Sequence, residues 1–168
     1  MEIVVKMKII LTELAKDIQL QQAGSNTFTP TRATIESAGY DVRACIVRPL
    51  TIYAGECIRI PLGFHIHIAH MEVAGLVLPR SGLGATHGIV LGNLVGLIDS
   101  DYQQEWQCAV WNRNIEGSIV INPFDKIAQV VFIPVLHPTL EVVDSFPNST
   151  SRVGGFGSTD ILNIKGLL

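Results

Sequence analysis

Residues 56–79 read ECIRIPLGFHIHIAHMEVAGLVLP, and this stretch decides the fold class. It contains three short runs, ECIRIP, GFHIHIA and VAGLVLP, which are bounded by proline, glycine or polar residues. In FHIHI (64–68) the apolar side chains fall on one face of an extended chain, and His65 and His67 fall on the other. This alternation is typical of a half-buried strand. We therefore predict three consecutive short strands, with the two histidines on a solvent face rather than at a metal site.

The same pattern continues on both sides of this stretch. Further strand-like runs are IVVKMKI (3–9), YDVRACIV (40–47), SIVIN (118–122), KIAQVVFIPV (126–135) and LEVVDSF (140–146), with a hairpin-like stretch over 92–112. Only residues 12–22 suggest a helix, with Thr12 as its N-cap. Many short strands with little helix predict an all-β fold, either a β-barrel or a jelly roll.

The chain length fits one domain followed by an arm. A chain of 168 residues can bury one sizeable core. Residues 148–168 contain GGFG and few core-forming runs, which is typical of a mobile terminal segment. We predict a β-domain over residues 1–147, which includes an extended N-terminal segment over 1–36, and a C-terminal arm over 148–168.

The composition excludes several classes of protein. Hydrophobic residues make up 48% of the chain, charged residues make up 16%, and the net charge is −3. This acidic balance argues against nonspecific nucleic-acid binding. The longest apolar stretch, residues 89–98, is roughly half the 20 residues that a membrane-spanning helix needs. The mean hydropathy of +0.36 therefore indicates apolar surface that is buried against further copies of the chain.

The cysteines and the N-terminus indicate a reducing compartment. Cys45, Cys57 and Cys108 are odd in number, far apart and without a CxxC pair, which fits neither a disulfide framework nor a zinc site. We expect buried free thiols. The first residues lack the basic start, apolar block and cleavage site of a signal peptide, so we expect a cytoplasmic protein.

The segment PRSGLG (79–84) combines an arginine, a hydroxyl and two glycines. Glycine tolerates positive φ, so successive backbone N–H groups can converge on an anion. The planar guanidinium of Arg80 offers several donors to phosphate oxygens. The alternative is a Pro-Gly turn after the strand VAGLVL with an incidental arginine, and this segment alone leaves both interpretations open.

The segment GLIDSDY (96–102) places Asp99 at the end of an apolar run. A carboxylate that emerges from apolar surroundings can hold and polarise a water. Asp101 lies two residues on, and on a strand both carboxylates would share a face. The alternative is a turn rich in Asp and Ser, which is a common local structure.

Three more segments have both a functional and a structural interpretation. GGFGST (154–159) joins flexible glycines to an aromatic ring, which suits a lid over a nucleobase, or is an ordinary tail. In SAGYD (37–41), Asp41 follows a glycine turn, and many such aspartates cap loops. In KIAQVVF (126–132), Gln129 is either a ligand or a satisfied edge polar group.

Together, SAGYD, PRSGLG, GNLVGLIDSDYQQE (92–105), KIAQVVF and RVGGFGST (152–159) resemble the five motifs of the trimeric dUTPase family, in the family's order. The similarity spans residues 37–159. It implies a jelly-roll-like β-barrel of the β-clip type, assembled as a three-fold homotrimer with active sites shared between chains and closed by the arm. It also implies Mg²⁺-dependent hydrolysis of dUTP to dUMP and pyrophosphate, with dTTP, dCTP and UTP excluded.

The resemblance implies a role for each matching residue. Asp99 is the catalytic residue that positions the attacking water, and Asp41 helps to hold a metal-bound water. The phosphate chain is bound by Arg80, Ser81, Gly82 and Gln129. Tyr102 packs under the deoxyribose, Asn93 and the hairpin positions Leu97 and Ile98 read uracil, and Gln107 lies near the base pocket. In the arm, Phe156 stacks on uracil, Arg152, Ser158 and Thr159 lie near the γ-phosphate, and Gly157 contributes to substrate binding.

The chain departs from the family pattern at several positions. Gln104 stands where most members have glycine, and Trp106 and Gln107 replace smaller or aliphatic residues. Only Val153 separates Arg152 from GGFG, where the family has two residues, and Asp160 replaces a common glycine. We hypothesise a working enzyme with a weakened lid.

Two other functions remain open at this point. A dCTP deaminase shares the fold and the trimer, but the GLIDSDY and GGFGST segments match dUTPase better. A trimeric dUTP-binding sensor or regulator without turnover is the second alternative, because the fifth segment is altered.

Overall fold

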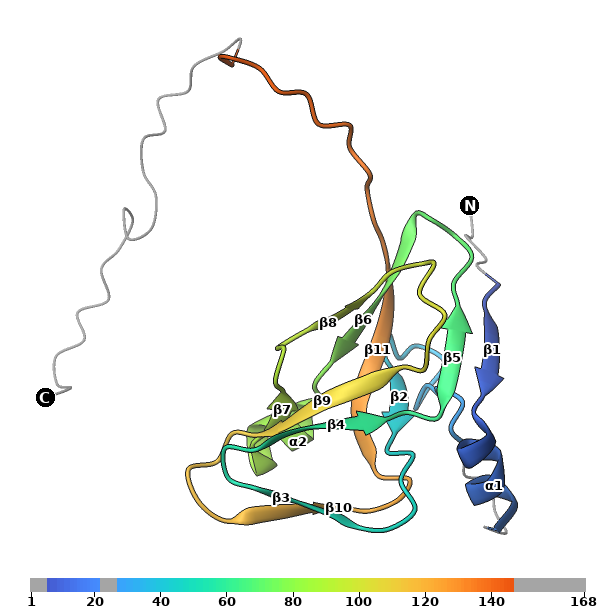
Figure 1. Ribbon diagram of the computed structural model, residues 1–168, viewed down its shortest axis with the longest axis vertical. Helices are drawn as coiled ribbons and strands as arrows, with labels where there is room; N and C mark the ends of the chain where they lie inside the picture. Colours follow the sequence, from blue (N-terminus) through green and yellow to red (C-terminus); the bar gives the residue numbers. More distant parts are fainter. Residues whose placement is uncertain (1–5, 22–26, 147–168) are drawn as a thin grey trace, which may run out of the picture. The chain divides into compact units, whose positions relative to one another are not determined.

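The computed structural model describes residues 6–21 and 27–146 (Figure 1). Contacts divide the chain into two units, Met1–His137 and Pro138–Leu168. All described helices and strands belong to the first unit, and residues 138–146 of the second unit contain neither. The predicted arm over 148–168 lies outside the described residues, and its boundary stays a prediction.

Short strands dominate the described residues, as the sequence predicts. The elements in chain order are β1 (Lys8–Leu11), α1 (Glu13–Gln21), β2 (Tyr40–Arg43), β3 (Leu50–Tyr53), β4 (Cys57–Pro61), β5 (Phe64–His67), β6 (Val73–Leu78), α2 (Ser81–His87), β7 (Ile89–Leu91), β8 (Gly96–Ile98), β9 (Gln107–Asn112), β10 (Ser118–Ile121) and β11 (Lys126–Pro134). No helix within the described ranges is both long enough and apolar enough to cross a membrane.

All strand pairs among the described residues are antiparallel, and they form several small sheets (Figure 1). The largest sheet has the order β2-β11-β6-β8, a second has the order β4-β9-β7, and two further pairs are β1-β5 and β10-β3. Strands that are distant in sequence are therefore neighbours in space. The all-β, jelly-roll-like fold that the sequence predicts is confirmed.

The main core is built from the inward-facing side chains of the strands. Phe64, Ile66, Trp106 and Val130 are among its buried members. On β5 the apolar residues are buried and His65 and His67 are partly exposed, so the predicted solvent face of the two histidines is confirmed. Each large apolar side chain that is fully buried contributes about 1.5–3 kcal/mol of transfer free energy.

The N-terminal segment adds a strand and a helix to this core. Strand β1 pairs with β5, from Lys8 opposite His67 to Leu11 opposite Phe64. Helix α1 follows at once, and Oγ1 of Thr12 accepts a hydrogen bond of 3.2 Å from the N–H of Ala15, as expected of an N-cap. The helix buries Ala15 and Ile18 in a second, smaller apolar cluster. The predicted helix and its cap are thus confirmed.

Three predictions about local structure need correction. The first strand covers Lys8–Leu11, so it overlaps only the end of the predicted run and extends past it, because its pairing with β5 fixes where it runs; residues 3–5 lie outside the described residues. The stretch 92–112 is not a hairpin, because β8 pairs with β6 whereas β9 pairs with β4 and β7. Residues 140–146 form no strand, because they have no partner strand among the described residues.

The prediction of buried thiols holds for two of the three cysteines. Burial raises the pKa of Cys108 to about 12, and burial together with the charge of Glu105 raises the pKa of Cys45 to about 11. Cys57 is exposed instead, because it occupies an outward-facing position of β4. None of the three is paired in a disulfide.

Candidate active site

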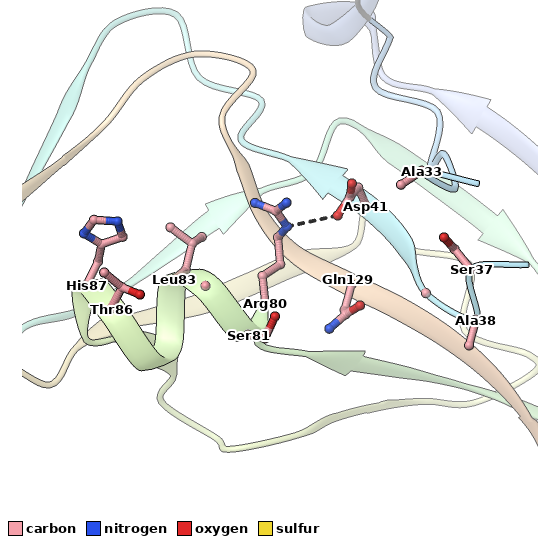
Figure 2. Close-up of a pocket in the computed structure, with 12 residues that line it drawn as sticks. Ala33, Ser37, Ala38, Asp41, Arg80, Ser81, Leu83, Thr86, His87 and Gln129 are labelled. Atoms are coloured by element: carbon pink, nitrogen blue, oxygen red, sulfur yellow. Dashed lines mark hydrogen bonds and ion pairs between the residues drawn. The ribbon is translucent and has the colours of Figure 1, made fainter.

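Three of the predicted motifs meet in one cleft of about 670 Å³ (Figure 2). Residues from the first, second and fourth motifs line it, and they come from β2, from the β6–α2 junction and from β11. The lining includes the predicted residues Asp41, Arg80, Ser81, Gly82 and Gln129. Most of them are polar, which suits a polyanionic ligand better than an apolar one.

The second motif spans the change from strand to helix. Arg80 follows β6 with an extended backbone (φ −85°, ψ 135°), and α2 begins at Ser81. The first backbone N–H groups of a helix lack intrahelical acceptors, so those of this turn are available to a ligand. A Cβ at Gly82 would meet no atom within 4 Å, so the backbone is open to the cleft here. The anion-binding interpretation of PRSGLG is therefore favoured over an incidental turn.

The cleft contains a compact cluster of three charges. Nε of Arg80 donates to Oδ1 of Asp41 at 3.0 Å, and Nζ of Lys126 lies 2.7 Å from Oδ2 of the same carboxylate (Figure 2 shows the Arg80 contact). Nη1 of Arg80 also donates to the backbone oxygen of Lys126 at 3.1 Å. The Asp41 side chain is only 13% exposed. Two cations thus share one anion, and the cluster keeps a net positive charge beside the cleft.

The sequence argument missed Lys126. The signal was available, because Lys126 is the first residue of KIAQVVF and the only cation in that motif. Its proximity to Asp41 depends on the pairing of β11 with β2, which aligns Lys126 with Arg43 and Gln129 with Asp41 across a β-bulge. Periodicity alone does not predict that pairing.

Gln129 is held against the second motif. Its Nε2 donates to the carbonyl oxygen of Pro79 at 2.9 Å. Gly39, in the first motif, leaves the room for this side chain, because a Cβ there would overlap Oε1 of Gln129 and lie 3.2 Å from its Cδ. The glycine of SAGYD thus lets the Gln129 amide approach closely, and a side chain at this position would displace that amide.

The residues of the third motif lie elsewhere on the same chain. None of Asn93, Leu97, Ile98, Asp99, Tyr102 and Gln107 lines the cleft. Leu97 is 62% exposed and Tyr102 is 41% exposed, so these side chains lie on the surface of the single chain. They are available to contact a ligand or another copy of the chain.

Strand register gives the separation between the two groups. Gly75 pairs with Ile98, so the chain leaves β8 for Asp99 at the end of the pair nearer to Ala74, and Arg80 lies six residues beyond Ala74 along the extended chain. Six extended residues at ~3.3 Å each amount to ~20 Å. Asp99 and Arg80 of one chain therefore cannot contact the same phosphate group.

Asp99 itself begins a turn. The N–H of Tyr102 donates to the oxygen of Asp99 at 3.2 Å, and β8 has already ended at Ile98. Asp99 and Asp101 are therefore not two positions on one strand face. The turn interpretation describes the backbone correctly, and it leaves the carboxylate of Asp99 without a hydrogen-bond partner among the described residues.

The predicted site residues of the arm, Arg152, Phe156, Gly157, Ser158 and Thr159, lie outside the described residues. The described residues also contain no group of three or more metal-ligating side chains. Within the described part of the chain, Asp41 is the only carboxylate that lines the cleft, and both of its oxygens already face cations.

Comparison with known proteins identifies the family. The dUTPase family model matches residues 25–160. The deoxyuridine 5'-triphosphate nucleotidohydrolases of Burkholderia multivorans and Burkholderia cenocepacia are each 48% identical over 143 residues, which cover 85% of this chain and 96% of theirs.

Solved structures show the same fold. The dUTPase of Staphylococcus bacteriophage 80alpha with dUPNHPP has a TM-score of 0.76 at 22% identity and covers 94% of this chain and 100% of its own. A mutant dUTPase from phage phi11 of S. aureus, whose structure concerns a structural Mg(II) ion, has a TM-score of 0.69 at 22% identity and covers 84% and 98%. The chain is therefore an enzyme that belongs to the dUTPase family.

Proposed function

We propose that this enzyme hydrolyses dUTP to dUMP and pyrophosphate at sites that are shared between the chains of a homotrimer. The observation that carries the proposal is the cleft in which Arg80, Ser81, Gly82 and Gln129 come together beside a cluster with net positive charge. Such a site suits the phosphate chain of a nucleotide. The family membership and the 48% identity to named dUTP nucleotidohydrolases support dUTP as that nucleotide.

The residues of the cleft bind the phosphate chain of the substrate. Arg80 has five N–H donors, and two of its nitrogens are engaged by Asp41 and by the backbone of Lys126. These two contacts fix the guanidinium plane and leave donors free for phosphate oxygens. Ser81, the backbone at Gly82 and the amide of Gln129 add further donors. Fixed donors of this kind stabilise the charge that develops on the leaving pyrophosphate.

Asp99 acts as the general base in the chemical step. Its carboxylate accepts a proton from a water as the water oxygen bonds to the α-phosphorus, and the bond from phosphorus to the bridging oxygen breaks in line. The electron pair leaves with pyrophosphate. Tyr102 packs under the deoxyribose, where a 2′-hydroxyl would clash. Asn93 and the backbone at Leu97 and Ile98 read the uracil edge, with Gln107 nearby.

The separation of ~20 Å along β6 supports the shared site, because Asp99 has to come from a different chain than Arg80. A closed three-fold ring supplies that geometry at every interface. The exposed Leu97 and Tyr102 then become covered by substrate and by the neighbouring chain. The arm completes the site, with Phe156 on the base and Arg152, Gly157, Ser158 and Thr159 toward the γ-phosphate.

Magnesium fits this arrangement as an ion that binds together with the substrate phosphates. The cleft offers one carboxylate, Asp41, whose oxygens face Arg80 and Lys126, so it would touch the ion only through water. Mg²⁺ prefers oxygen ligands and keeps several waters in nucleotide sites. When bound, it offsets the negative charge of the phosphates.

The decisive experiment measures pyrophosphate release by the purified protein with Mg²⁺, with dUTP, dTTP, dCTP and UTP offered in parallel. We expect release from dUTP alone, and release from an Asp99→Asn control that is slower on the order of 10²- to 10⁴-fold. Release from dCTP or dTTP at a similar rate would refute the specificity. Tight dUTP binding without release would instead identify a sensor. Native mass determination should give three chains per particle.

A further inference from the structure

The loop between β8 and β9, residues 99–106, carries both Asp99 and Tyr102 and is fastened at its two ends. At its start, Ile98 pairs with Gly75 of β6. At its end, the N–H of Trp106 donates to the oxygen of Phe64 at 3.0 Å, and the N–H of Leu62 donates to the oxygen of Trp106 at 3.0 Å. The loop is therefore anchored to β6 on one side and to β5 on the other.

Trp106 connects the two anchors. Its side chain is 1% exposed and packs on Phe64, with ring centroids 5.7 Å apart. The far edge of its indole ring occupies the space beside Gly75, where an added Cβ would lie 2.9 Å from Cη2. The Trp106 indole thus contacts both β5 and β6 near the two ends of the loop.

Between these anchors, one side chain of β5 reaches the loop. Nδ1 of His65 lies 3.0 Å from the backbone oxygen of Gln103, one residue after Tyr102. A carbonyl oxygen can only accept, so Nδ1 carries the proton and donates. His67, on the same face of the strand, makes no hydrogen bond or ion pair among the described residues.

His65 is itself held in place by the N-terminal segment. Ile10 of β1 is its partner across the antiparallel pair, and Thr12 donates its N–H to the oxygen of Gly63 at 2.9 Å. Glu105 of the loop adds a further contact to the start of β5, because its Oε1 accepts a hydrogen bond from the N–H of Gly63 at 3.2 Å. The donor at position 65 therefore projects from a strand that is paired along its whole length.

We propose that His65 is a positioning residue, which holds the 99–106 loop so that Asp99 and Tyr102 keep their orientation toward the substrate. The inference rests on the proposed function for the roles of these two residues. Loss of the Nδ1–H donor frees the middle of the loop while both ends stay anchored. The consequence is a slower chemical step and weaker selection against the 2′-hydroxyl, without a loss of fold.

The test compares four variants for turnover of dUTP and UTP. His65→Phe keeps a flat ring without a donor. His65→Ser is too short to reach Gln103, and it provides a second variant without the contact in case His65→Phe does not fold. His65→Asn retains a side-chain N–H near the position of Nδ1. His67→Phe is the matched control on the same strand face.

We expect kcat for dUTP to fall about threefold to tenfold in His65→Phe and His65→Ser, which corresponds to the net contribution of one hydrogen bond. The ratio of kcat/KM for dUTP over UTP should narrow, KM for dUTP should change little, and His65→Asn should recover most of the loss. Wild-type kinetics in His65→Phe and His65→Ser would overturn the proposal. A His65→Asn variant as slow as His65→Phe would do the same.

Hydrogen exchange separates this inference from the proposed function. Amides of residues 100–105 should exchange about threefold to tenfold faster in His65→Phe than in the wild type or in His67→Phe, whatever the substrate of the enzyme. If the wild type fails to hydrolyse dUTP but the exchange difference appears, the proposed function is wrong, whereas the role of the His65–Gln103 hydrogen bond in holding the loop is supported. Unchanged exchange would overturn the inference on its own.

Discussion

A single carboxylate, Asp41, governs the charge of the phosphate cleft. It is mostly buried and has a cation on each oxygen, Arg80 at 3.0 Å and Lys126 at 2.7 Å. Partly buried charges of this kind are stable only when they are paired and hydrogen-bonded. Asp41 therefore orients Arg80 as much as it serves any ligand. Because two cations share it, a polyanion can still be attracted to the cleft.

Asp99→Asn is the first prediction at the residue scale. The amide keeps the size of the side chain but cannot accept the proton of the attacking water. Turnover should fall on the order of 10²- to 10⁴-fold, which is the usual contribution of a general base. Binding of dUTP, measured by calorimetry, should remain nearly intact. Near-normal turnover would remove Asp99 from its role.

Gly39→Ala is the second prediction at this scale. The new methyl would overlap Oε1 of Gln129, so the amide has to give up its 2.9 Å bond to Pro79. We expect KM for dUTP to rise about threefold to tenfold, since one polar contact to phosphate is misplaced. The control is Gln129→Ala: in that background Gly39→Ala should add nothing, because the two changes act on the same side chain. Additive effects would contradict this explanation.

Residue types and their order were enough to predict which residues of three motifs line one cleft, and their role in phosphate binding stays a prediction. Arg80, Ser81 and Gln129 line the cleft, as the motifs indicated. Lys126 and His65 were missed as contributors, because each acts on a residue far away in sequence. Lys126 reaches Asp41 across the β2–β11 pair, and His65 reaches Gln103 across 38 residues.

At the level of elements, the N-terminal segment is an integral part of the domain. Strand β1 covers the edge of β5, and α1 buries Ala15 and Ile18 beside Cys45. Phe28 and Phe124 stack in the same cluster with ring centroids 4.4 Å apart. An extension that the motifs do not explain thus contributes its own small core.

Thr12→Ala is the prediction that tests this element. Thr12 caps α1, and loss of such a cap costs about 1 kcal/mol. In a chain of this size the melting temperature should drop by about 2–4 °C, measured by calorimetry. Thr12→Ser keeps the hydroxyl and should melt close to the wild type. An equal drop in both variants would assign the effect to the lost methyl group rather than to the cap.

The sequence predicted the existence of most elements but not all of their partners. The alternation in FHIHI and the cap at Thr12 are local signals, and both were correct. The stretch 92–112 failed as a hairpin because its two strands join different sheets. Residues 140–146 have the composition of a strand, but a strand also needs a partner. Pairing is a tertiary property that a local pattern does not encode.

At the scale of the whole molecule, the two halves of the site are the main consequence of the fold. The phosphate cleft and the Asp99 loop lie at opposite ends of β6, ~20 Å apart by strand rise. The proposed function therefore requires an assembly, because a lone chain would hold the two halves of the site too far apart to act on one substrate.

Mixing of inactive variants tests this directly. In a closed ring of three, each site takes Arg80 from one chain and Asp99 from its neighbour. Arg80→Ala and Asp99→Asn chains, unfolded together and refolded at equal amounts, should recover about a quarter of wild-type dUTP turnover, since random pairing makes one site in four intact. Each variant refolded alone is the control. No recovery in the mixture would mean that both residues act within one chain.

The distance along β6 also has a meaning in genetics. Consider a cell with two copies of the gene, in which each site uses residues from two chains. The fraction of intact sites is then the same whether both substitutions lie in one copy or one substitution lies in each copy. Either arrangement leaves about a quarter of the sites intact, because each half of a site is sampled independently. A site confined to one chain would give half in the first case and none in the second. The separation of two residues at opposite ends of β6 thus determines whether two recessive alleles complement each other.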